Sequence, residues 1–318
     1  MPEDSASGGT VGLRPALGIL LKVVSVAVFV GMSTLIKSTG AVPPGQIVFF
    51  RSAFAVIPIL IFLAFRSELP TALRTSHPVS HIVRGIVGVS AMGCGFYALT
   101  LLPLPEVITL GYAQPLIVVV LSALIVGETV RLYRWSAVII GLAGVLVIVW
   151  PRLTLFTSGA PLEEKEALGV TAVLSAAVIS AFAIIMVRRL VATERSATIV
   201  LWFSLTASVA GLLTLPFGWI SLSQPQVLAL IGAGICGGVG QILMTESYRH
   251  AEMSTVAPFE YTSMVLGIAS GYLFFGDLPT TNMLVGGLIV VGAGLFIIWR
   301  ESRLGLERGK ARRVTPPQ

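Results

Sequence analysis

Long apolar stretches follow one another along almost the whole chain, and this feature limits the possible folds most strongly. An α-helix needs about 20 mostly apolar residues to cross the hydrocarbon core of a bilayer. Because backbone polar groups cannot stay unpaired in lipid, apolar runs of this length predict membrane-spanning helices. We predict an all-α membrane protein with ten transmembrane helices, at about residues 15–36, 46–65, 79–101, 107–126, 135–150, 167–187, 198–217, 226–247, 255–275 and 281–299.

The composition excludes a soluble globular protein. Of the 318 residues, 55% are hydrophobic and 11% are charged, and the mean hydropathy is +0.92. A soluble domain carries about 25% charged residues. The net charge of +6 does not indicate nucleic-acid binding, because the basic residues lie between the apolar stretches and in the C-terminal tail. The polar start of the chain has no basic n-region, so we expect no cleavable signal peptide.

The distribution of Lys and Arg predicts the orientation in the membrane, because short cytosolic loops are enriched in both residues. With a cytosolic N-terminus, sixteen of them lie on the cytosolic side and three on the other side, while Lys22 and Arg51 lie within spans. We therefore expect an even number of spans and both termini on the cytosolic side of a cell inner membrane. Outside the spans we expect a flexible cytosolic N-terminus at 1–14, a periplasmic linker at 151–166 and a disordered basic tail at 300–318.

The two halves of the chain resemble each other. Residues 97–150 and 248–299 both run from a Tyr through an apolar helix to a glycine followed by an acidic residue, and then through a Gly-rich helix to a Trp. The pairs Gly127-Glu128 and Gly276-Asp277 stand 149 positions apart. Their equivalent placement predicts an internal repeat.

Each predicted repeat, at 15–150 and 167–299, holds five spans. Because five is an odd number, the second repeat must enter the membrane from the opposite side. Inverted repeats of this kind are a recurring design of transporters, in which one half rocks against the other and exposes a central site to each side in turn. The sequence therefore predicts two inverted five-helix repeats around such a site.

The chain resembles the EamA-type branch of the drug/metabolite transporter superfamily over about residues 16–299. The resemblance implies ten helices in two inverted repeats, with a central cavity lined by spans one, three, four, six, eight and nine, and spans five and ten packed to one side. Members of this group move amino acids, riboflavin, S-adenosylmethionine, nucleotide-like compounds or drugs. Asp277 stands where many members have Glu. The residues that carry the resemblance are Pro115, Gly127, Glu128, Ala257, Pro258, Phe259, Glu260, Tyr261, Thr262, Gly271, Phe275, Gly276, Asp277, Pro279 and Gly286.

Glu260 and Lys22 are the first candidates for the transport site. An ionisable group inside a span is costly and marks a functional site by default. Both residues lie about 10 Å from the cytosolic end of their spans, at about 1.5 Å per residue. We expect them to form an ion pair in the cavity that binds substrate or a proton. Two structural alternatives remain, a Lys22 that snorkels to the cytosolic surface and a static strut.

Further polar groups lie in the spans that the resemblance places at the cavity. A metabolite site combines an apolar wall with a few placed hydrogen-bonding groups. Each group can instead hold helices together or anchor an interface. The additional cavity candidates are Tyr97, Tyr112, Gln114, Gln241, Tyr261 and Thr262.

Other polar and conformationally special residues are assigned structural roles. We expect Arg51 to snorkel or to pack against Glu106 rather than to contact substrate. Glu128 and Asp277 are expected to hold the turns after spans four and nine by bonding to loop backbone or a nearby Arg. Pro115 is expected to bend span four, either as a gating kink or as a tolerated feature.

The sequence points to a secondary transporter and not to an enzyme. His77 and His81 have a metal-compatible spacing but no third ligand, so we expect no metal site, and no nucleotide or cofactor motif is present. We expect export of an amino acid or a similar small polar metabolite, with possible proton coupling, by a monomer or homodimer. Uptake of a cofactor-like compound such as riboflavin or S-adenosylmethionine is the alternative. An intramembrane enzyme is the alternative from another class.

Overall fold

The computed structural model describes residues 15–125, 132–157, 164–191, 193–250 and 257–314, and these residues contain helices and no strands. Helices satisfy their own backbone hydrogen bonds, which is what an apolar environment requires. The α-helices are α1 (Pro15–Ser38), α2 (Pro44–Phe65), α3 (Pro78–Leu101), α4 (Leu104–Gly111), α5 (Ala113–Ile125), α6 (Leu132–Thr157), α7 (Glu164–Val191), α8 (Ser196–Leu212), α9 (Gln224–His250), α11 (Thr262–Ser270) and α12 (Thr281–Val314).

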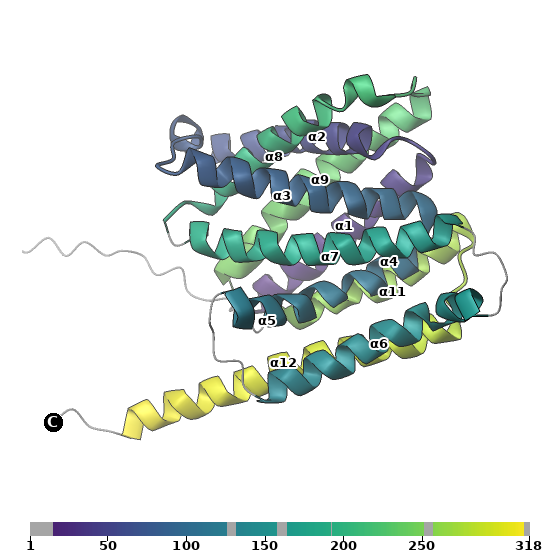
Figure 1. The fold of residues 1–318 in the computed structure, drawn as a ribbon. Coiled ribbons are helices and arrows are strands. Elements are labelled where there is room, and N and C mark those ends of the chain that lie inside the picture. The colour runs from purple at the N-terminus through teal and green to yellow at the C-terminus, as the bar shows by residue number, and fades with distance from the viewer. Residues whose placement is uncertain (1–14, 126–131, 158–163, 192, 251–256, 315–318) are drawn as a thin grey trace, which may run out of the picture.

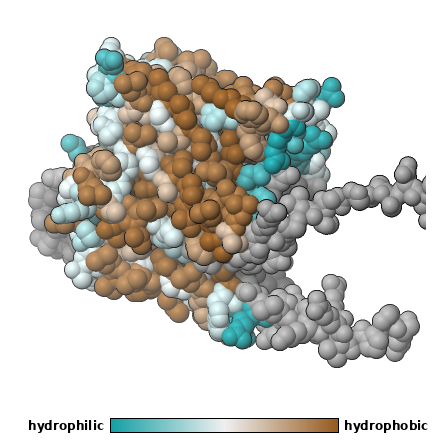
Figure 2. All heavy atoms as spheres, turned by 180° about the vertical axis from the view of Figure 1, so that it is seen from behind, coloured by the Kyte–Doolittle hydropathy of each residue, from teal (hydrophilic) through white to brown (hydrophobic). Residues whose placement is uncertain are grey.

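Seven helical segments of the described residues are long and apolar enough to cross a membrane. Two shorter apolar helices, Trp135–Trp150 and Ala197–Leu212, accompany them. The surface between the ends of the bundle is broadly hydrophobic (Figure 2). A surface of this extent is unsuited to water, so the chain is a multi-pass membrane protein.

Helices from the two halves of the chain pack against each other. The most extensive contacts join α1 with α9, α3 with α7, α6 with α12, and α2 with both α9 and α8. The pair of α6 and α12 lies along one side of the bundle (Figure 1). The two helices approach each other closely where Gly144 faces Gly286. A Cβ atom on Gly144 would stand 2.8 Å from the Gly286 carbonyl oxygen, so a larger residue there would force the helices apart.

The fourth predicted span is broken in the structure. We expected one helix over residues 107–126, whereas α4 ends at Gly111 and α5 begins at Ala113. Pro115 explains the break, because it has no N–H to donate to the carbonyl of Gly111. Tyr112 instead closes a tight turn by donating its N–H to the carbonyl oxygen of Thr109 at 3.2 Å. The bend that Pro115 was expected to cause therefore lies one turn before the proline.

The ninth predicted span is also segmented. It consists of a 3₁₀ turn at Ala257–Tyr261, then α11, and then a π-helical turn at Gly271–Phe275. The backbone leaves this span at Gly276, whose φ of 69° lies in the left-handed region that favours glycine. Irregular backbone at membrane depth is tolerated where protein surrounds it or where it lines a cavity.

The C-terminal tail departs from the expectation of disorder. Helix α12 continues beyond Arg300 as far as Val314. The segment Arg300–Val314 contains Arg, Glu, Leu and Lys, which have high helix propensity and favour continuation of the helix, and it contains no proline, although Gly305 and Gly309 weaken the tendency. Helix α12 ends at the same end of the bundle at which α1 begins (Figure 1).

Candidate transport site

Lys22 and Glu260 are brought together by the fold. The Lys22 ammonium forms an ion pair and a hydrogen bond with the Glu260 carboxylate, from α1 to the 3₁₀ turn before α11. The Lys22 side chain is only 2% exposed, whereas the Glu260 side chain is 51% exposed. One alternative was that Lys22 snorkels to the cytosolic surface, and the burial of its side chain argues against it. A buried cation that binds a solvent-accessible carboxylate leaves the carboxylate free to meet a ligand or a proton.

Two tyrosines extend the polar group around Glu260. The Tyr112 hydroxyl lies 2.5 Å from the Ser263 hydroxyl, and the Tyr112 ring meets the Tyr261 ring edge-on at a centroid distance of 5.1 Å. The Tyr261 hydroxyl lies against Gly294 of α12, where no side chain would fit beside it. Thr262 donates its hydroxyl to the Phe259 carbonyl and so stabilises the local turn. Tyr112 and Tyr261 thus link the break in the fourth span to the turn that carries Glu260.

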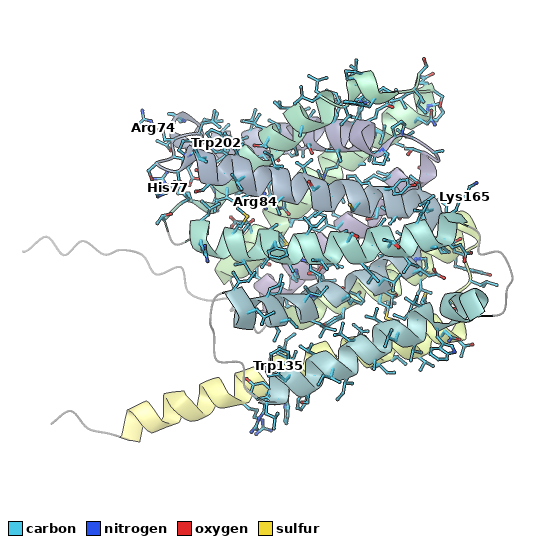
Figure 3. All side chains as sticks on the ribbon, viewed as in Figure 1. Arg74, His77, Arg84, Trp135, Lys165 and Trp202 are labelled. Atoms are coloured by element: carbon cyan, nitrogen blue, oxygen red, sulfur yellow. The ribbon has the colours of Figure 1, made fainter. Side chains whose placement is uncertain are left out.

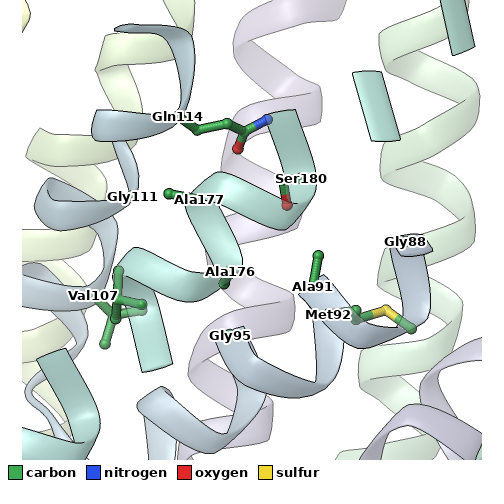
Figure 4. A pocket seen from close by; sticks show the side chains of 11 residues that line it. Gly88, Ala91, Met92, Gly95, Val107, Gly111, Gln114, Ala176, Ala177 and Ser180 are labelled. Atoms are coloured by element: carbon green, nitrogen blue, oxygen red, sulfur yellow. The ribbon is translucent and has the colours of Figure 1, made fainter. Parts of the chain in front are cut away.

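A cavity of about 240 Å³ lies between α3, the α4–α5 break and α7. Its wall is built from small residues, and Gln114 and Ser180 supply its polar side chains (Figure 4). Gly88 and Gln114 each lie about 15 Å from the start of their spans, which places the cavity near the middle of the bundle. The residues that line it do not include Lys22 or Glu260, so the ion pair and the cavity are separate features of this conformation.

Gln114 is the one predicted site residue that lines this cavity, and Tyr97 and Gln241 belong neither to its lining nor to the group around Glu260. Tyr97 is 37% exposed and does not line the cavity. Gln241 is half-buried in α9, where its backbone carbonyl accepts a hydrogen bond from Thr245. Glu246, in the same helix, pairs with Arg66 at 3.1 Å.

Asp277 lies where the two halves of the chain meet at the end of the bundle opposite to α1's first residue. Its carboxylate accepts a hydrogen bond from the Leu104 N–H at 3.4 Å, at the start of α4, and lies 3.7 Å from the Lys37 ammonium. Lys37 also donates to the Leu102 carbonyl at 2.7 Å. The contact to backbone is the kind that the sequence predicted, although the basic partner is a lysine and not an arginine. Gly127 and Glu128 lie outside the described residues, as does the side chain of Pro258.

Two arginines inside the bundle were not recognised as site candidates. Arg51, which was expected to snorkel or to pack against Glu106, is buried, with 7% of the residue exposed. Arg84 was counted as a loop charge, yet it lies in α3, one turn from the cavity residue Gly88. Figure 3 shows Arg84 further into the bundle than Arg74 and His77. The predicted span at 79–101 already contained Arg84, so its position within the membrane was available from the sequence.

The histidine pair has a structural setting. His81 is buried, stacks on Trp202 and lies 3.9 Å from Glu194. Among the described residues, no three His, Cys, Asp or Glu side chains gather closely enough to hold a metal ion.

Comparison with known proteins settles the family. The model of the EamA-like transporter family matches residues 16–150 and again residues 167–300. The chain belongs to this family. It is therefore a membrane transporter and not an enzyme, with two family repeats that cover most of its length.

Curated relatives and one solved structure agree with this assignment. The pseudopaline exporter of Pseudomonas aeruginosa is 31% identical over 282 residues, which cover 87% of this chain and 94% of that one. The S-adenosylmethionine uptake transporter of Rickettsia prowazekii is 24% identical, with 81% and 84% covered. The riboflavin transporter of Rhizobium johnstonii is 28% identical, with 83% of each covered. One crystal structure superposes with a TM-score of 0.64 at 20% identity, covering 89% of this chain and 97% of that one, a likeness of fold alone.

Proposed function

We propose that the chain is a secondary transporter that exports a small polar metabolite, an amino acid or a similar compound, by alternating access. The observation that carries the proposal is the ion pair between a buried Lys22 and a half-exposed Glu260 inside the bundle. An intramembrane carboxylate with a cationic neighbour suits the binding of an ammonium group or a proton, since either can compete with the lysine. Tyr112, Tyr261 and Thr262 are the proposed neighbours of the bound substrate.

We further propose that ten spans form two inverted five-helix repeats, at 15–150 and 167–299. The packing of helices supports this arrangement. If each span of the first half is exchanged for its counterpart in the second, the contact of α1 with α9 becomes that of α7 with α3, and both are present. The contacts of α2 with α8 and of α6 with α12 map onto themselves. A two-fold axis in the membrane plane generates this pattern.

The proposed setting is the inner membrane, with both termini in the cytosol and the linker at 151–166 in the periplasm. The excess of Lys and Arg on one side of the spans supports this orientation. Glu260 then faces the cytosol, from which an exporter takes its substrate. Exchange of a proton at the same carboxylate is the proposed coupling.

Uptake of a cofactor-like compound is the second candidate. Its support is that the relatives include transporters named for riboflavin and for S-adenosylmethionine uptake. Export is preferred because the exporter of pseudopaline reaches the higher identity, at 31%.

The decisive experiment has two parts. An untargeted comparison of metabolites inside and outside cells with and without the protein identifies the compound and its direction. Saturable counterflow of that labelled compound in liposomes containing the purified protein then distinguishes a carrier from a channel. Export predicts that the compound accumulates inside cells that lack the protein, while depletion inside them would establish uptake. Linear flux without counterflow would exclude a carrier.

A further inference from the structure

Two arginines inside the bundle have buried guanidinium nitrogens, and the described part of the chain shows no acidic partner for either. Arg51, from α2, is 7% exposed, and its Nε has no hydrogen-bond partner. Arg84, from α3, has two buried nitrogens, Nε and Nη1, that also lack a partner. Among the described residues, neither arginine takes part in an ion pair. Because a buried charge is costly unless it is paired, these two groups call for an explanation.

No carboxylate is placed to pair with these arginines from the surrounding helices. Helices α2, α3 and α8 contain no Asp or Glu. The acidic residue of α9 is Glu246, which pairs with Arg66. The two guanidinium groups also lie close enough to repel one another. The molecule thus concentrates positive charge at a place where the described chain supplies no counter-charge.

The surroundings give the guanidinium groups space and orientation. A Cβ atom on Gly237 of α9 would stand 3.0 Å from Arg51 Nε and 3.3 Å from its Cζ, so the missing side chain makes room for Arg51. The Arg84 guanidinium stacks over the ring of Phe203 at 4.2 Å. This stacking fixes the plane of the guanidinium and uses its face, which leaves the N–H groups at its edge for a ligand.

Arg84 lies near the mid-bundle cavity, although the residues that line the cavity include neither arginine. Residues Gly88, Ala91, Met92 and Gly95 of α3 line that cavity, and Arg84 precedes them by one helical turn on the same face. Phe203 connects the two places, because its ring also lies 2.9 Å from where a Cβ on Gly88 would stand. The positive charge of Arg84 is therefore within about one helical turn of an existing hollow.

We propose that Arg51 and Arg84 form an anion site that binds a carboxylate group of the transported metabolite. Arginine offers only donors, arranged as a planar fork that matches the two oxygens of a carboxylate. One such group between the arginines would end their mutual repulsion and satisfy the buried N–H groups. The inference rests on the proposed function, since it extends the substrate from a polar metabolite to an acidic or zwitterionic one.

Binding of a simple dicarboxylate tests the site without any need for transport. The full-length protein is placed in nanodiscs of phosphatidylcholine, which has no net charge, and thermal unfolding is followed as succinate is added. We expect succinate to raise the Tm in a saturable way, because a ligand that binds the folded state stabilises it. Succinamide, which lacks the charge, and sodium chloride of equal ionic strength should not. Absence of a saturable effect of succinate would overturn the proposal.

Variants assign the effect to the two arginines. Arg51→Gln and Arg84→Gln should each weaken succinate binding by about tenfold or more, the loss expected for a charge-assisted contact. Neither change should lower the Tm of the ligand-free protein, because each removes an unpaired buried charge. Arg74→Gln, in the exposed turn before α3, is the matched control and should bind like the wild type. Normal succinate binding in both interior variants would refute the site.

A second variant protects the test against misfolding. Gly237→Ala keeps every charge but fills the space beside Arg51, so it should weaken succinate binding less than Arg51→Gln does.

Two further arms of the experiment identify the source of the anion. Stronger binding of inorganic phosphate than of succinate would show that the site recognises a phosphate group and not a carboxylate. Loss of succinate binding in nanodiscs of phosphatidylglycerol, an anionic lipid, would show that the site binds a lipid headgroup. Succinate binding that persists in Glu260→Gln shows that the anion site stands even if the proposed role of Glu260 fails.

Discussion

The two ends of the helix bundle use their charged side chains in different ways. At the end where α1 finishes, Asp277 accepts a hydrogen bond from the backbone of the other half and lies beside Lys37, which donates to the backbone of its own half. The side chains of Lys37 and Asp277 are 15% and 20% exposed. At the end where α1 begins, the Lys22 ammonium is buried but the Glu260 carboxylate is 51% exposed. The first end is sealed by contacts between the halves, whereas the second leaves its carboxylate within reach of solvent.

Uncharged contacts reinforce the seal at the first end. The side-chain amide of Gln46 both donates to the carbonyl of Ile220, at 3.0 Å, and accepts from its N–H, at 3.2 Å. Gln226 donates to the Thr39 carbonyl at 2.9 Å. These bonds join helix ends that are far apart in sequence. If the protein alternates access as proposed, the bonds at the first end must break whenever the transport site opens at that end.

The largest expected effect comes from the exposed carboxylate. Glu260→Gln keeps the shape of the side chain and removes its charge, so it should leave the folded protein nearly intact and reduce counterflow by about tenfold or more. Lys22→Ala should also reduce activity, since it removes the partner of Glu260. Counterflow of the identified metabolite across a range of pH values measures both variants. Wild-type transport with an unchanged pH profile in Glu260→Gln would remove Glu260 from the site.

A double-mutant cycle sharpens the assignment of the pair. If Lys22 and Glu260 act together, the combination of Lys22→Met with Glu260→Gln should lose little beyond the worse single variant. Losses that add up would show that the two residues contribute independently. In that case the ion pair of the structure is a contact without a shared role in transport.

The second prediction concerns the sealed end. Asp277→Asn removes the ion pair with Lys37 and weakens the bond to the Leu104 N–H, so it should lower the free energy of unfolding by about 1–2 kcal/mol. Thermal unfolding in nanodiscs measures the loss, and protein level and transport should fall with it. Asp277→Glu, which keeps the charge, is the control. Full stability together with abolished transport would move Asp277 from a structural role into the transport site.

The depth of a charge in a span was readable from the sequence, but the direction of its side chain was not. Lys22 and Glu260 were paired on depth alone, and the structure places them in contact. Arg84 was overlooked because it was counted with the cytosolic charges, although the predicted span at 79–101 already contained it. The break at Tyr112 was also hidden, since Pro115 predicts a disturbed helix without saying on which side the chain will turn. The helical tail was missed because its charges suggested disorder more strongly than its helix formers suggested a helix.

The third prediction fixes which end faces the cytosol. In a background without Cys94 and Cys236, a cysteine at Ser221 should react with an impermeant reagent in intact cells, whereas one at Ser76 should react only after the inner membrane is permeabilised. Both serines are exposed, at opposite ends of the bundle in the proposed topology. Because the excess of Lys and Arg sets the orientation, the contrast should be nearly complete. The reverse labelling pattern would place Glu260 on the periplasmic side, and the end where α1 finishes would then face the cytosol.

The smallest expected effect lies at the end of the bundle where α1 begins. There, the Thr75 hydroxyl donates a hydrogen bond to the Glu194 carboxylate at 2.6 Å. This hydrogen bond is the main cause that lowers the pKa of Glu194 below its usual value. A carboxyl group with a lowered pKa stabilises the fold above its ordinary pKa and loses that stabilisation as the pH falls through the lowered value. Thr75→Val should therefore lower the free energy of unfolding by about 1 kcal/mol at neutral pH and by progressively less in acid.

Thr71→Val is the matched control, because Thr71 bonds to the Glu68 carbonyl and to Arg195 but to no carboxylate. Thermal unfolding between neutral and acidic pH measures both variants, and a cost for Thr75→Val that does not change with pH would show that the hydroxyl acts without the charge of Glu194.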